Sequence, residues 1–156
     1  LLKDYFYVQN NYVQLNPNIF GKVNYFLGGK SSAIGWDLSW GRMALVTSEG
    51  SRSTGSMRPF GLDCSGFVTW SFINSGFSAS QIGHGASTQA SKCTRISWSS
   101  AEPGDLAFLS DLSHVGIVAG RDASGNILVI HCSSGANNVV ITTNSIFGFA
   151  ARPNCY

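Results

Sequence analysis

The strongest constraint on the fold is a series of five short strand-like segments in the last third of the chain. Each segment is rich in β-branched and apolar residues, and turns rich in glycine, serine and asparagine separate them. The turn "DASGN" at 122–126 lies between two β-branched segments, a pattern typical of a β-hairpin. Consecutive segments joined in this way predict an antiparallel sheet. The five segments are 105–110, 114–120, 127–132, 139–143 and 147–152.

One apolar helix is expected before these strands. Residues 64–75, "CSGFVTWSFINS", carry apolar side chains nearly all round, so the helix should be buried, and Gly76 fits its C-terminal stop. A helix followed by hairpin-linked strands favours an α+β domain with helices on one side of an antiparallel sheet. We interpret residues 1–20 as a helix or an irregular lead-in, and 22–61 as a long structured loop.

Length, charge and cysteine usage exclude several classes of protein. The 156 residues fit one domain, and no internal repeat or second domain is visible. A net charge of +2 with scattered arginines excludes a nucleic-acid-binding surface. No segment approaches the ~20 apolar residues of a membrane span, and the N-terminus lacks the shape of a signal peptide. The four cysteines form no CxxC pair and no histidine lies at zinc-finger spacing from them, so we expect no metal and no other cofactor.

Cys64 opens the predicted helix, which is a position that favours reactivity. The helix dipole and the unpaired N–H groups there stabilise a thiolate, so we predict that the pKa of Cys64 falls. The same N–H groups suit the oxyanion of a tetrahedral intermediate, and Gly66 should leave room for a substrate backbone. The alternative is a buried structural thiol, because free cysteines are commonly buried. If Cys64 is free, the other three cysteines permit at most one disulfide.

A nucleophilic thiol needs a base, and the chain has only three histidines. His114 begins one strand segment and His131 lies near the end of another. If these segments pair through a turn centred between Ser124 and Gly125, residue i lies opposite residue 249 − i. His131 then faces Val118, about 13 Å along the strand from His114. This simple hairpin does not bring the two histidines into contact, although a bulge would change its register.

Five ordered motifs resemble the NlpC/P60 family of cell-wall cysteine peptidases. They are "NYFLGG" (24–29), "DCSGF" (63–67), "PGDLAF" (103–108), "HVGIVAG" (114–120) and "VIHC" (129–132). The resemblance implies a papain-like core: an antiparallel sheet of about five to six strands with helices packed on one side. It also implies a single catalytic domain over 1–156. The family has a shorter spacer before its cysteine, so the segment at about 28–60 is expected to be an insertion.

The resemblance implies a catalytic triad. Cys64 would be the nucleophile, His114 the general base and later the general acid, and His131 the residue that orients the imidazole of His114. The alternative for His131 is a purely structural role at the end of its strand. His84 matches no member of the triad, and we interpret it as a loop residue; the alternative is that it lines the cleft. Cys132 follows His131 and should point to the opposite sheet face, into the core.

The resemblance also implies substrate-binding residues. Tyr25 would place its phenol near the reacting carbonyl. Asp63 and Ser65 would line the adjacent subsite, where the family grips the free amine of a stem peptide, because an aspartate pairs with an ammonium. Asp63 also fits as the cap of the helix that starts at Cys64, and the two roles are compatible.

The leading functional hypothesis is a secreted or wall-associated peptidoglycan hydrolase that cleaves stem peptides, at the bond between D-γ-glutamate and the diamino acid. Flanking wall-binding domains outside this chain are expected as partners. A second hypothesis is an N-acetylmuramoyl-L-alanine amidase or an acyltransferase with the same triad. A third is a non-catalytic wall-binding module that uses the aromatic residues of 22–61. The sequence does not discriminate which diamino acid is preferred.

Overall fold

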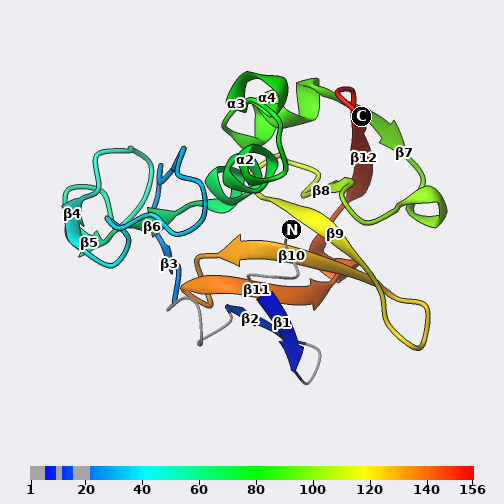
Figure 1. The fold of residues 1–156 in the computed structure, drawn as a ribbon, viewed down its shortest axis with the longest axis horizontal. Coiled ribbons are helices and arrows are strands. Elements are labelled where there is room, and N and C mark those ends of the chain that lie inside the picture. Colours follow the sequence, from blue (N-terminus) through cyan, green and yellow to red (C-terminus); the bar gives the residue numbers. More distant parts are fainter. Residues whose placement is uncertain (1–5, 10–11, 16–21) are drawn as a thin grey trace.

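The computed structural model describes residues 6–9, 12–15 and 22–156. Its centre is a six-stranded antiparallel sheet in the order β11-β10-β9-β8-β12-β7 (Figure 1). The α+β class and the antiparallel sheet are confirmed, and β7 is a strand that the sequence did not predict. The strands are β7 (Cys93–Ile96), β8 (Leu106–Phe108), β9 (Val115–Arg121), β10 (Ile127–Ser133), β11 (Asn138–Thr143) and β12 (Phe149–Pro153).

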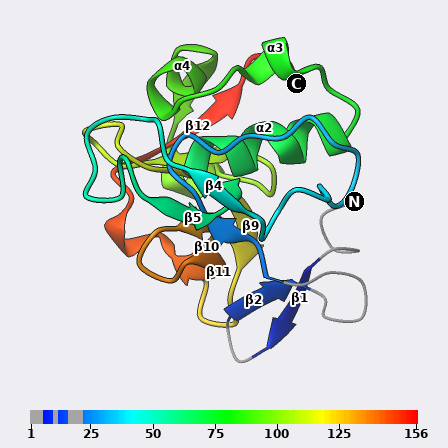
Figure 2. The same ribbon diagram turned by 90° about the vertical axis from the view of Figure 1, so that its left-hand side faces the viewer.

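The helices of the described residues lie on one side of the sheet (Figures 1 and 2). The predicted buried helix is α2 (Cys64–Asn74), and ten of its eleven residues are buried. It packs against β9 and β10. The chain leaves the helix at Gly76, whose φ of 95° is a left-handed conformation that favours glycine. The segment that follows, which carried no helix prediction, forms α3 (Ala79–Ile82) and α4 (Ala86–Ser91). Two 3₁₀ turns, η1 (Trp98–Ser100) and η2 (Asn144–Ile146), join strands.

Three two-stranded sheets complete the described fold. The prediction of a helix or an irregular lead-in for 1–20 is wrong where the structure describes it, because β1 (Phe6–Gln9) and β2 (Tyr12–Leu15) pair as an antiparallel hairpin. Most of 22–61 has no regular structure, in agreement with the predicted loop. Its ordered pieces are the parallel pair β3 (Asn24–Tyr25) and β6 (Gly61–Leu62), and the antiparallel pair β4 (Met43–Leu45) and β5 (Met57–Pro59).

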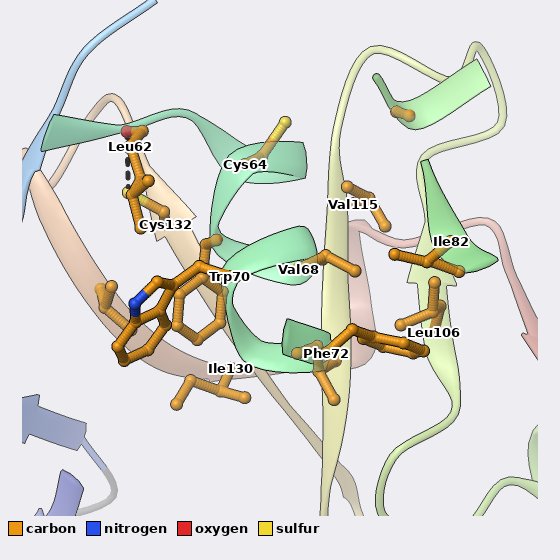
Figure 3. Close-up of a cluster of buried hydrophobic side chains, with 14 of the residues drawn as sticks. Leu62, Cys64, Val68, Trp70, Phe72, Ile82, Leu106, Val115, Ile130 and Cys132 are labelled. Atoms are coloured by element: carbon orange, nitrogen blue, oxygen red, sulfur yellow. Dashed lines mark hydrogen bonds between the residues drawn. The ribbon is translucent and has the colours of Figure 1, made fainter. Parts of the chain in front are cut away.

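Both faces of the sheet are covered by buried clusters of apolar side chains. Successive residues of a strand point to opposite faces, so neighbours in the sequence belong to different clusters. Figure 3 shows Val68, Trp70 and Phe72 of α2 packed over strand residues such as Ile130. A second, smaller cluster covers the other face of the sheet and includes Phe147. Burial of apolar surface in these two clusters is the main force that holds the helices and loops to the sheet. Among the described residues, no helix has both the length and the apolar character that crossing a membrane requires.

Candidate active site

Asp63 fixes the point at which α2 begins. Its backbone is extended, and its Oδ1 accepts hydrogen bonds from the backbone N–H of Gly66 at 2.7 Å and from the hydroxyl of Ser65 at 3.0 Å. The predicted helix cap is therefore confirmed. The other carboxylate oxygen, Oδ2, accepts a hydrogen bond from the N–H of Gly28 at 3.1 Å. These contacts hold Cys64 in the first turn, where the N–H groups of Cys64 and Ser65 have no carbonyl partner within the helix.

Glycines allow the chain to pack its own backbone against this helix start. The N–H of Asp63 donates to the carbonyl of Gly29 at 3.1 Å. A Cβ atom at Gly66 would overlap that same carbonyl oxygen, and a Cβ atom at Gly61 would overlap the carbonyl oxygen of Asn24. The prediction that Gly66 leaves room for a substrate backbone is thus wrong, because the space is filled by Gly29.

Tyr25 reaches the helix start through a short parallel ladder. Its Cα pairs with that of Leu62, and its N–H donates to the side-chain oxygen of Asn137 at 2.9 Å. Burial raises the pKa of Tyr25 well above its ordinary value, and negative charge on Cys64 and Asp63 raises it further. The phenol therefore lies within electrostatic range of both groups and stays protonated, as a hydrogen-bond donor must.

Cys64 is buried, and its thiol differs from the predicted one. Hydrogen bonds from the backbone N–H groups of Val115 and Ser65 favour the thiolate. Burial acts in the opposite direction and more strongly, and with the charge of Asp63 it raises the pKa of Cys64 to about 11. The prediction of a lowered pKa is wrong, so the neutral thiol is the resting form at pH 7 and a base must remove its proton. Val115 directly follows His114, so the sulfur lies next to the segment that carries the candidate base.

The two histidines are in direct contact. His114 Nε2 lies 2.7 Å from His131 Nδ1. The simple hairpin that keeps them about 13 Å apart is therefore wrong. Its register holds only to within one residue near the turn, where Leu128 pairs with Gly120, and then shifts so that Val129 pairs with Val118. The irregularity is a β-bulge that shifts the register by one further residue, so His131 lies two residues closer to His114 than in the predicted ladder.

Gly116 provides the space for this contact. A Cβ atom there would lie 2.9 Å from the Cβ of His131 and 2.5 Å from Cγ1 of Val129. The absent side chain lets His131 cross the neighbouring strand and reach His114. Phe147 stacks on the ring of His114 and meets the ring of His131 edge-on, with centroids 5.7 and 5.3 Å away. The pair therefore lies in an apolar environment with little freedom to rotate.

Thr142 on β11 completes a chain of hydrogen bonds that sequence reasoning missed. Its hydroxyl donates to the carbonyl of Thr143 at 3.0 Å, so its oxygen is left to accept from His131 Nε2, also at 3.0 Å. His131 then carries its proton on Nε2 and accepts at Nδ1 from His114 Nε2. This pattern leaves the lone pair of His114 on Nδ1. In the β10–β11 ladder His131 pairs with Val140, and Thr142 is the diagonal neighbour two residues on. A register predicted from the sequence for the β10–β11 hairpin could have identified Thr142 as a neighbour of His131.

Burial keeps both imidazoles neutral. It lowers the pKa of His131 to about 4, with a smaller effect in the same direction from His114. Burial also lowers the pKa of His114, and the negative charge of Asp63 partly opposes that shift. A neutral imidazole can accept a proton, which is what a general base requires.

The remaining predicted residues lie around Asp63. Ser65 is buried and its hydroxyl is used by Asp63, so it faces the inside of the helix start. His84 is a loop residue between α3 and α4, as predicted, and its Nε2 lies 3.7 Å from Asp63 Oδ2. Cys132 is in the core on the α2 side, as predicted, and its thiol donates to the carbonyl of Leu62 at 3.3 Å (Figure 3). All four cysteines are free thiols. Within the described residues no three histidine, cysteine or acidic side chains gather as a metal site requires.

The chain is similar to several known proteins in sequence and in fold. The chain is similar to a protein of Listeria innocua named "Probable endopeptidase p60", with 44% identity over 72 residues, which are 44% of this chain and 15% of that protein. The structure resembles that of the peptidoglycan hydrolase RipB from Mycobacterium tuberculosis, with a TM-score of 0.59 and 22% identity over 83% of this chain and 57% of that one. It resembles equally the P60 domain of antigen MAP1204 from M. avium subspecies paratuberculosis, with a TM-score of 0.59, 20% identity and 84% of each chain covered.

These two structures show the shared fold, while the family model named "NlpC/P60 family" matches residues 22–148, which include every motif from 24–29 to 129–132. The chain therefore belongs to the NlpC/P60 family.

Proposed function

We propose that this domain is a cysteine peptidase that hydrolyses peptidoglycan stem peptides, at the bond between D-γ-glutamate and the diamino acid. The observation that carries the proposal is the chain of hydrogen bonds through His114 and His131, which leaves Nδ1 of His114 free as a base beside the strand start that contacts Cys64. Membership of the family supports the substrate class, because the relatives that the chain matches are named as endopeptidases and peptidoglycan hydrolases.

The proposed reaction starts from the neutral thiol of Cys64 and the neutral imidazole of His114. His114 Nδ1 accepts the proton of Cys64 as the sulfur bonds to the carbonyl carbon, which avoids a separate thiolate whose formation burial opposes. The N–H of Cys64 and the protonated phenol of Tyr25 would donate to the oxyanion. The imidazolium of His114 then gives its proton to the leaving amine as the C–N bond breaks. A water molecule, deprotonated by His114, cleaves the thioester and restores the thiol.

The roles of the other residues follow from their surroundings. His131 holds the tautomer of His114 and disperses its transient charge. Asp63 still has an oxygen, Oδ2, whose described partners are an N–H at 3.1 Å and the ring of His84 at 3.7 Å, so it is the proposed contact for the free amine of the stem peptide. The substrate places the proposed site of action outside the cell, at the wall.

The test is digestion of a synthetic tetrapeptide, L-Ala–γ-D-Glu–L-Lys–D-Ala, read by mass spectrometry. Wild type should release L-Ala–D-Glu, and Cys64→Ala should be at least about a thousandfold slower. Cys93→Ala is the matched control, because Cys93 is a free thiol on β7, an edge strand of the six-stranded sheet. Equal product from wild type and Cys64→Ala would remove Cys64 from the mechanism. If a muropeptide substrate is cleaved only at the bond between muramic acid and L-Ala, the enzyme is an amidase instead.

A further inference from the structure

A cavity of about 390 Å³ opens at the end of the sheet that holds the helix start. Three segments far apart in the sequence form it: β3, the loop around β4 and β5, and the turn between β10 and β11. Figure 1 shows these segments at the same end of the sheet as the start of α2. The polar and charged side chains in its lining are those of Tyr25, Arg52, Arg58, Ser134 and Asn137, with further serines from the loop.

The charge of this cavity is positive. Arg52 and Arg58 line it, and none of its lining residues is acidic. Neither arginine forms an ion pair with a carboxylate that the structure describes. Arg58 uses only its Nε within the described residues, as a donor to the hydroxyl of Ser56 at 3.1 Å. Two guanidinium groups with free donors in one concave site match a carboxylate, which can accept paired N–H···O bonds from each.

Tyr25 connects this cavity to the proposed chemistry. Tyr25 is one of the residues that line the cavity, and negative charge on Cys64 raises the pKa of its phenol. The Asn137 side chain holds the backbone of Tyr25 at 2.9 Å, so the turn that closes the cavity also fixes the tyrosine. A ligand that fills the cavity can therefore contact Tyr25 and both arginines.

We propose that Arg52 and Arg58 form a carboxylate-binding subsite that holds a free carboxylate of the stem peptide during cleavage. This inference rests on the proposed function, and it assigns a specificity role to residues of the expected insertion. The two positive arginines line the cavity and the negative Asp63 does not, so a peptide with a free amine and a carboxylate has one favourable direction in the site. Amidation of the carboxylate removes the attraction.

The test measures binding to the Cys64→Ala protein, which keeps the peptide intact. The probe is L-Ala–γ-D-Glu–L-Lys–D-Ala with both carboxylates free, and calorimetry gives its Kd. Arg52→Gln and Arg58→Gln should each weaken binding about three- to tenfold, a modest factor because both arginines are exposed to solvent. Arg42→Gln is the matched control: Arg42 is an exposed arginine of the same loop that does not line the cavity, and the Kd should not change.

Two amidated probes identify the carboxylate. One carries the amide on the α-carboxyl of D-glutamate and the other on the C-terminus. The probe that has lost the recognised carboxylate should bind with the same Kd to the Cys64→Ala protein and to both arginine variants made in it. Equal losses for the acid and for both amides would overturn the subsite, as would unchanged binding in both variants or no binding of the acid at all. If the acid binds in an arginine-dependent manner but wild type does not cleave it, the proposed function fails while the subsite stands.

Discussion

The buried pair of histidines makes the fold sensitive to acid in a defined way. The pKa of His131 is lowered from 6.5 to about 4, so the unfolded chain takes up a proton at this residue before the folded one does. The stabilising effect of keeping His131 neutral is complete above pH 6.5. It decreases as the pH falls from 6.5 toward 4, because protons then bind preferentially to the unfolded state.

The size of the effect follows from these two pKa values. Between pH 7.5 and pH 4.5 the linkage relation gives a loss of about 2–3 kcal/mol in the free energy of unfolding from this one residue. Such a loss is a large share of the stability of a small domain. In His131→Asn the residue no longer titrates, so that share of the pH dependence should disappear, although the variant is less stable at pH 7.5.

The assay is urea unfolding of wild type and His131→Asn at both pH values, followed by tryptophan fluorescence. Ser133→Ala, on the same strand, is the control and should keep the pH dependence of wild type. A titration of the imidazole of His131 by NMR should have its midpoint near pH 4. Equal losses of stability in wild type and His131→Asn between pH 7.5 and 4.5 would refute the reasoning.

Three further predictions concern the same neighbourhood. Thr142→Val removes the acceptor that fixes the tautomer of His131, so kcat on the tetrapeptide should fall about tenfold with little change in KM, while Thr142→Ser should retain activity; equal activity of the two variants would argue against the role of the hydroxyl. Gly116→Ala pushes on His131 and should destabilise the fold by about 1–3 kcal/mol in urea unfolding and lower kcat; an unchanged unfolding midpoint would contradict the close packing. The kcat/KM of wild type should fall on the acid side with a midpoint below 6.5, because burial lowers the pKa of His114, and a midpoint above 6.5 in a pH–rate profile would contradict it.

Much of the fold could be predicted from hydrophobic patterning. The five strand segments and the apolar helix at 64–75 depend on local periodicity, and they form where the pattern places them. Strand β7 escaped prediction because "CTRI" is short and half exposed, so it carries little periodic signal. The helices α3 and α4 are six residues or shorter, which is too brief for a helical period to be visible.

The candidate site was predictable by residue but not by geometry. The contact between His114 and His131 depends on a β-bulge, and a bulge leaves no reliable mark in an alternating pattern. The direction of the pKa shift of Cys64 was wrong because the helix dipole is a local feature, whereas burial depends on the whole fold. Thr142 is one of several threonines in the chain, and only the ladder with β10 singles it out.

The glycine contacts beside the helix start have a consequence for how the chain could change length. The segment between Gly29 and Gly61 begins and ends at one point, because a Cβ atom at Gly29 would overlap the carbonyl oxygen of Gly61. Since its two ends already touch, lengthening or shortening this excursion alters closure entropy only slightly and does not strain the main chain around the thiol. Gly35 and Trp40 tie the first part of the excursion to α2, so the loop between β4 and β5, which carries Arg52, is the part that evolution could exchange most freely.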